Sequence, residues 1–260
     1  MLQLPLDQLL LVITQAALLT ILIIRLWSAG LNRLYPYFFG YLVAELLRTM
    51  VMSVVPFKGR AYPYFWVGGE AVIVCFYALI VVELYRVVLR DLPGIASISR
   101  RYIAATVAIA SAGSLLLLFL EEKSRNYVST FLQIERAIVF SLVIFILLGS
   151  AFLAYYPIPL NRNVVIYSIG YSVYFLTKAT ALFVRTLGYR VSQQISVILL
   201  LVSSGCLLFW ALTLNRRGEL RTMVIGHKWK REDEALLLSK LKAINANLAE
   251  ARKTVIPTPQ

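Results

Sequence analysis

Apolar residues dominate seven separate stretches of this 260-residue chain, and together they occupy most of the sequence before residue 214. A hydrocarbon core about 30 Å thick requires roughly 20 apolar helical residues to cross it. Backbone groups in lipid must be satisfied within the segment, so such stretches indicate helices. We therefore expect an all-α membrane protein built as a seven-transmembrane-helix bundle. The predicted spans are residues 6–26, 34–55, 63–85, 102–120, 130–153, 164–184 and 193–214.

The first apolar stretch is predicted to be a retained membrane helix and not a cleavable signal peptide. A signal peptide begins with a basic region followed by a short apolar core. Here Asp7 comes before a long apolar run, and the first basic side chain is Arg25, near the end of that run.

Composition agrees with a membrane location, because 60% of the residues are hydrophobic and only 15% are charged. This balance lies outside ordinary soluble usage. The net charge of +13, taken alone, would also be compatible with a nucleic-acid partner. However, the basic residues gather at predicted helix ends and in the tail, where they meet anionic lipid headgroups. We therefore expect the lipid bilayer as a partner, and no nucleic acid.

The distribution of Lys and Arg also predicts an orientation. Residues 86–101 contain four Arg and the tail begins with a basic run at 216–231, whereas the N-terminus carries no basic side chain. Cytoplasmic loops are enriched in Lys and Arg. The pattern thus predicts a multi-pass protein of the plasma (inner) membrane, with the N-terminus outside and the C-terminus in the cytoplasm.

Ionisable residues inside the predicted spans are the main candidates for function, because each is costly in lipid unless it finds a partner within the bundle. Glu45 and Arg48 are three residues apart and therefore share one helix face. At 1.5 Å per residue, the set falls at similar depth in the outer half of the membrane. It comprises three acids and three bases: Glu45, Arg48, Glu70, Glu135, Arg136 and Lys178.

Two interpretations of these six residues remain open. They either form an internal ion-pair network that fixes helix order, or line a polar cavity, open to the outside, that binds a small polar ligand or passes protons. Equal numbers of acids and bases are compatible with both interpretations, because a buried charge without a partner has a large desolvation cost. Glu83 and Arg86 are expected to form a separate i, i+3 pair at the cytoplasmic interface.

The chain is predicted to divide into a bundle at 1–214 and a basic cytoplasmic tail at 215–260. Residues 232–252 are expected to form a short amphipathic helix, because acids in its first turn match the helix dipole. Its apolar positions step as a two-heptad seam. That stripe could dock on the bundle, lie on the membrane or bind another chain or a second copy, and we expect the last. Its residues are Leu237, Leu241, Ile244 and Leu248.

Recognised catalytic motifs are missing from the sequence: it contains no HExxH, GxSxG or Walker pattern. The single histidine, His227, lies in the tail, so we expect no metal site and no cofactor. The function hypothesis is a non-enzymatic receptor-like sensor or a subunit of a larger membrane complex. The alternative is a small proton-coupled transporter that uses the intramembrane Glu and Lys residues.

Overall fold

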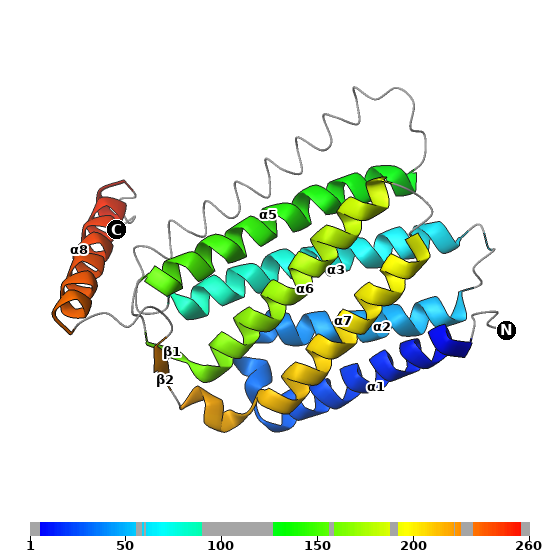
Figure 1. Cartoon of the computed structure of the whole chain (residues 1–260), viewed down its shortest axis with the longest axis horizontal. Helices are drawn as coiled ribbons and strands as arrows, with labels where there is room; N and C mark the ends of the chain where they lie inside the picture. Colours follow the sequence, from blue (N-terminus) through cyan, green and yellow to red (C-terminus); the bar gives the residue numbers. More distant parts are fainter. Residues whose placement is uncertain are drawn as a thin grey trace, which may run out of the picture.

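The computed structural model describes residues 6–55, 59, 61–89, 127–155, 159–187, 192–220, 222–224 and 231–255. Within these ranges the chain is almost entirely helical (Figure 1). The predicted span at 102–120 lies outside the described residues. The α-helices are α1 (Leu6–Ser28), α2 (Pro36–Val54), α3 (Tyr62–Val88), α5 (Tyr127–Tyr155), α6 (Arg162–Leu187), α7 (Ser192–Thr213) and α8 (Arg231–Val255).

Short elements at the helix junctions were not predicted from the sequence. They are two 3-10 helices, η1 (Leu31–Arg33) and η3 (Arg216–Glu219), and two strands, β1 (Pro159–Asn161) and β2 (Thr222–Val224). The strands pair antiparallel, with Leu160 opposite Met223. Three-residue strands are too short to show the alternation of apolar and polar residues that identifies a strand.

Proline and glycine explain two of the helix boundaries. Pro36 and Pro63 occupy the first turns of α2 and α3, where the missing N–H costs nothing because it would have no helical acceptor. Gly30 follows the end of α1 with a φ of 70°. A side chain rarely tolerates this left-handed conformation, so glycine lets the chain turn into η1.

Four of the described helices are long and apolar enough to cross a membrane. These segments are Leu10–Ser28, Pro36–Val54, Tyr62–Val88 and Phe131–Gly149. Helix α7 contains a shorter apolar segment, Val197–Thr213. Large apolar side chains such as Leu47, Val72 and Ile144 are more than half exposed on the outer faces of these helices. Exposed apolar side chains on helices of this length and composition indicate contact with lipid, and they support a membrane protein.

Six helices pack as a closed ring. The main contacts run from α1 to α2, α3, α5, α6, α7 and back to α1. In Figure 1, α1, α3, α5 and α7 run from the end where the N-terminus lies, and α2 and α6 run in the opposite direction. Side chains that point inward from different helices therefore meet in one interior.

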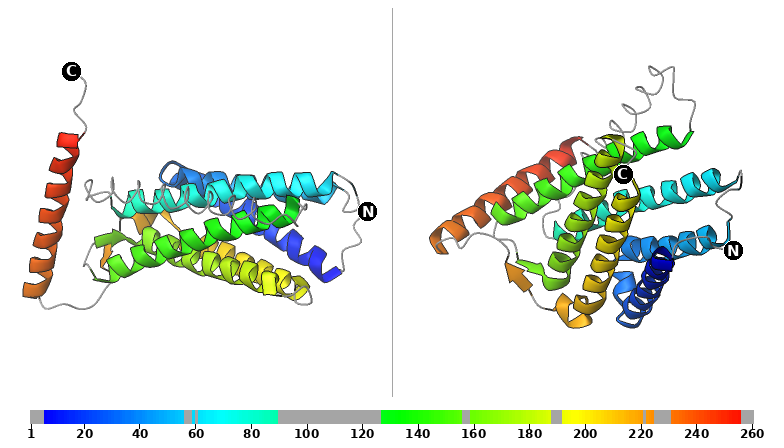
Figure 2. Two further views of the ribbon diagram at one scale, coloured as in Figure 1. Left: turned by 90° about the horizontal axis from the view of Figure 1, so that it is seen from above. Right: turned by 45° about the vertical axis from the view of Figure 1, so that its right-hand side comes forward.

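The tail helix α8 stands apart from the ring at the end where α7 finishes. Figure 2 shows that it runs across the direction of the bundle helices. Leu241 in the predicted stripe is 3% exposed, whereas Ile244 is 46% exposed. Leu237 and Leu248 are half-buried.

The contact between α6 and α7 depends on a glycine. A Cβ atom on Gly170 would overlap the indole nitrogen of Trp210, which is 2% exposed. On α7, by contrast, a Cβ atom on Gly205 would meet nothing within 4 Å. The first position permits close helix approach, as small residues do in membrane bundles.

We predict that Gly170→Ala lowers stability by about 1–3 kcal/mol, because an added methyl group overpacks the interface. The matched change Gly205→Ala should be neutral or stabilise by up to about 1 kcal/mol, because Ala has the higher helix propensity. Unfolding of both variants in mixed micelles measures the difference. Equal stability of the two variants would contradict this account of the α6–α7 contact.

Candidate functional site

Glu45 and Arg48 open the charged cluster on α2, one helical turn apart. The guanidinium group donates from Nη2 to Glu45 Oε1 at 2.7 Å and from Nε to Glu45 Oε2 at 3.1 Å. This two-point contact uses the fork geometry that makes Arg–carboxylate pairs strong. It holds Arg48 facing inward from α2.

Glu70 connects three helices. Its Oε2 forms an ion pair with Nη1 of Arg48 on α2. Its Oε1 forms an ion pair with Nζ of Lys178 on α6 at 2.6 Å. The Glu70 side chain is only 8% exposed. A buried carboxylate with a cation on each oxygen is compensated in the way that desolvation demands.

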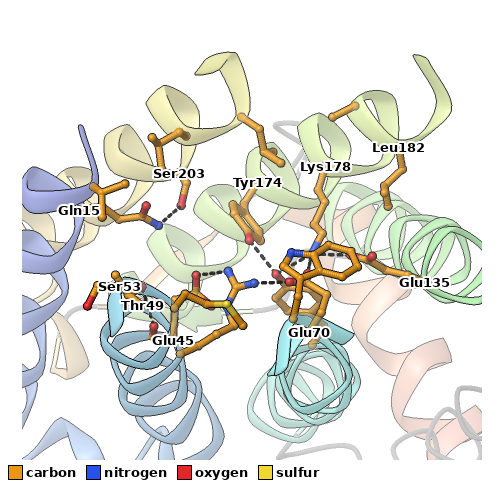
Figure 3. Close-up of a pocket in the computed structure, with 18 of the residues that line it drawn as sticks. Gln15, Glu45, Thr49, Ser53, Glu70, Glu135, Tyr174, Lys178, Leu182 and Ser203 are labelled. Carbon is orange, nitrogen blue, oxygen red and sulfur yellow. Dashed lines mark hydrogen bonds and ion pairs between the residues drawn. The ribbon is translucent and has the colours of Figure 1, made fainter. Parts of the chain in front are cut away.

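Lys178 carries the cluster to α5. Its Nζ lies 2.8 Å from Oε1 of Glu135, whose side chain is 2% exposed. The same ammonium group donates to the Tyr77 hydroxyl at 3.0 Å and lies 4.5 Å from the centre of that ring. Figure 3 shows Lys178 reaching from α6 toward both Glu70 and Glu135.

Arg136 does not join this cluster, contrary to the prediction from the sequence. It is half-buried and makes no ion pair with any other residue that the structure describes. Adjacent helical residues point about 100° apart, so Arg136 is turned to the side when Glu135 faces the centre of the ring. The predicted balance of three acids and three bases becomes three carboxylates against two cations.

A cavity of about 340 Å³ lies beside the cluster, inside the ring (Figure 3). Every charged member of the cluster lines it. The Arg48 side chain is 24% exposed, and the other members are almost fully buried. Gln15 of α1 and Ser203 of α7 lie 3.5 Å apart on the far wall. The cavity therefore brings polar groups from all six ring helices together.

Aromatic side chains form further parts of the cavity wall. Tyr62 and Trp66 come from the first turns of α3, and the buried Tyr77 and Tyr174 come from α3 and α6. The hydroxyl groups of Tyr77 and Tyr174 are 2.7 Å apart. The sequence interpretation did not single out Tyr77, although it lies one heptad after Glu70 and so on a similar face. Gln15 could also have been found from the sequence, because its polar amide stands within a mostly apolar helix.

Glu83 and Arg86 do not form the predicted ion pair. Glu83 instead accepts the backbone N–H groups of Tyr37 at 3.0 Å and Phe38 at 3.1 Å, and Tyr167 donates to it at 3.2 Å. It therefore caps the start of α2, where unsatisfied N–H groups and the helix dipole favour a carboxylate. Arg86 is exposed and forms no salt bridge with Glu83.

A column of packed aromatic rings joins the cavity to the segment that follows α7, and the sequence did not indicate it. From the cavity, ring centres follow at 5.0, 5.4, 4.8 and 5.2 Å. We call this series the aromatic column: Tyr77, Phe175, Tyr171, Tyr167 and Tyr35.

At its far end, the aromatic column reaches Glu219 of η3. Tyr35 donates its hydroxyl to Glu219 at 2.8 Å, and Asn163 and Asn161 donate at 2.6 and 3.2 Å. Burial, and next the charge of Glu219, raise the pKa of Tyr35, so its hydroxyl group remains a donor. These hydrogen bonds attach η3, the first segment after α7, to the starts of α2 and α6.

Within the described ranges, no group of three or more His, Cys, Asp or Glu residues is arranged to hold a metal ion. The candidate site is therefore defined by its ion pairs and by the cavity they line.

We predict that Lys178→Met destabilises the bundle by about 3–5 kcal/mol, because it leaves Glu70 and Glu135 without their shared cation. The control Arg136→Gln should cost about 1 kcal/mol or less, since it breaks no ion pair in the described part of the chain. Unfolding of detergent-solubilised protein by SDS titration measures both. If the two variants unfold alike, Lys178 does not hold the ring together.

Comparison with protein-family models, with curated proteins and with solved structures finds no match to this chain.

Proposed function

We propose that this chain is a non-enzymatic, receptor-like membrane sensor that binds a small polar ligand in the central cavity and transmits binding to its C-terminal segment. The proposal includes seven spans, with residues 102–120 as the span between α3 and α5. It also places the N-terminus outside and the tail in the cytoplasm, in a plasma (inner) membrane. The Arg-rich segment at 86–101 and the basic tail support this orientation.

The observation that carries the proposal is the aromatic column. One end contacts the charged cluster through the Tyr77 hydroxyl and Lys178. The other end holds η3 through Tyr35 and Glu219. A continuous series of packed side chains between two sites is a physical route for coupling when both sites bias its arrangement.

A ligand in the cavity would act by changing the ion pairs. Lys178 divides its contacts among Glu70, Glu135 and Tyr77. A ligand that competes for either carboxylate changes the position of the ammonium group, and Tyr77 and Phe175 then repack. Such a ligand shifts the equilibrium only by its difference in affinity for the two arrangements.

The tail is the output in this proposal, and we expect α8 to bind another protein chain or a second copy. Its stripe is partly covered at Leu241 and open at Ile244. The position of α8 across the bundle direction also suits a helix that lies on the membrane surface. Native purification in mild detergent separates the roles, because co-purifying proteins indicate a complex subunit and bound small molecules indicate a sensor.

A proton-coupled carrier is the second candidate, and one contact favours it. Glu70 and Glu135 share a single ammonium group deep in the ring. A carboxyl pair in that position can take up and release a proton as its environment changes. Flux measurements in liposomes distinguish the two candidates, because a carrier produces a pH-driven flux and a sensor does not.

Coupling along the aromatic column can be tested without knowing the ligand. We expect Glu70→Gln to change amide hydrogen exchange at Gly218 and Leu220 by about fivefold or more, the size of typical coupling between sites. Both amides donate hydrogen bonds within the turn at η3. The control is Val72→Ala on the outer face of the same helix, where Val72 is 51% exposed.

Tyr171→Leu should remove the effect of Glu70→Gln on exchange, because it interrupts the ring contacts on both sides. Exchange at Gly218 and Leu220 that stays unchanged in Glu70→Gln would mean that the cavity and the tail are independent. The sensor proposal would then lose the observation that supports it.

For the tail, we predict that Leu241→Lys combined with Ile244→Lys releases the partner or dimer and leaves the bundle folded. Two charges in a seam of two heptads oppose its burial. Mass and co-purifying proteins in mild detergent provide the measurement, with Lys242→Ala on the exposed face of α8 as control. A double variant with the partners and mass of the wild type would place the stripe on lipid or on the bundle.

A further inference from the structure

The charged cluster carries an excess negative charge. Glu45, Glu70 and Glu135 face Arg48 and Lys178, and Arg136 lies outside the cluster. An uncompensated charge in an apolar interior is far more costly than in water. Something of positive charge is therefore needed beside these carboxylates when the ring is in the membrane.

Both existing cations are already paired with carboxylates. Arg48 directs Nε and Nη2 to Glu45 and Nη1 to Glu70. Lys178 donates to Glu70, Glu135 and Tyr77, which uses the three hydrogens of an ammonium group. Arg48 uses three of its five N–H groups in these contacts. An anion at the remaining two would add to a cluster that already carries excess negative charge, whereas a cation would reduce that charge.

The cavity has room for more than a proton. Its volume of about 340 Å³ lies within the range of small-molecule sites. Tyr62, Trp66, Tyr77 and Tyr174 contribute to its wall, and aromatic faces attract cations. The Lys178 ammonium group, 4.5 Å from the Tyr77 ring centre, shows the arrangement within the chain itself.

We propose that the cavity binds a small organic cation of the ammonium type, an assignment that rests on the proposed function of the cavity as a ligand site. The cation compensates the excess carboxylate, with Glu135 as the principal partner. In the described structure, the one ion-pair partner of Glu135 is Lys178, which it shares with Glu70. Aromatic rings enclose the ligand, and Gln15 and Ser203 provide oxygen acceptors for its N–H groups.

Thermal unfolding of the full chain in detergent tests this assignment with defined probes. We would add methylammonium chloride, tetramethylammonium chloride, sodium acetate or urea, each against sodium chloride at the same ionic strength. The expected result is a saturable rise in the melting temperature with the two ammonium salts and none with acetate or urea.

Glu135→Gln is the decisive variant, because it removes the excess charge with almost no change in shape. It should fold with at least the stability of the wild type and bind methylammonium about tenfold more weakly or worse, the usual effect of losing a charged contact. Glu250→Gln, an exposed glutamate on α8, is the matched control and should bind like the wild type. Trp66→Leu keeps every charge and should weaken tetramethylammonium more than methylammonium.

Three results would overturn the cation assignment, and they differ in what they mean for the proposed function. Stabilisation by acetate alone would leave the cavity as a ligand site but for anions. Stabilisation by mildly acidic pH without any effect of the ammonium salts would mean that a proton compensates the charge. No response to any probe or to pH, together with unchanged exchange at η3 in Glu70→Gln, would overturn both proposals.

The groups that titrate or carry charge around the cavity are Glu45, Arg48, Tyr62, Glu70, Tyr77, Glu135, Tyr174 and Lys178.

Discussion

The ammonium group of Lys178 is the contact on which the interior of this protein depends. It meets carboxylates from two other helices, Glu70 at 2.6 Å and Glu135 at 2.8 Å, and all three side chains are nearly inaccessible. An isolated charge in such a place would be prohibitively expensive. The helices α3, α5 and α6 are therefore held at the distance and rotation that keep the three groups together. Arg48 extends the same constraint to α2 through Glu70.

This constraint explains why a cavity exists at all. Apolar side chains close-pack and leave few voids larger than a water molecule. Polar groups on α1, α2, α3, α5, α6 and α7 instead point at one another around an opening of about 340 Å³. The opening lies in the half of the ring near the start of α1, and the other half is filled by aromatic rings. The molecule thus combines a polar chamber with a densely packed column.

Two glutamates outside the cluster have structural roles at the opposite end. Glu83 caps α2 and accepts the hydroxyl of Tyr167, and Glu219 accepts the hydroxyl of Tyr35. The rings of Tyr167 and Tyr35 pack in a tilted arrangement with their centres 5.2 Å apart. The hydroxyl of each of these two tyrosines therefore donates to a carboxylate. A change in the cavity has a short, packed route to the point where the tail leaves the ring.

The sequence by itself determined the helices and the candidate charges. Long apolar runs permit only helices in lipid, which predicted α1, α2, α3, α5, α6 and α7 within a few residues. Six ionisable residues in those runs were identified because a charge in an apolar segment is conspicuous. The same reasoning could not choose partners, since helical spacing relates residues on one helix but not between helices.

Tertiary structure decided which of these charges meet. The rotation of α5 directs Glu135 inward and leaves Arg136 out, which turns a predicted balance into an excess of one carboxylate. Likewise, Glu83 lies within one turn of Arg86 but binds the start of α2. The N–H groups there have no helical acceptor, so hydrogen bonds from them stabilise the carboxylate more than an exposed guanidinium group does. The aromatic column was hidden for a similar reason: Tyr and Phe are ordinary residues in a membrane helix. Only the packing of α2, α3 and α6 makes them a continuous series.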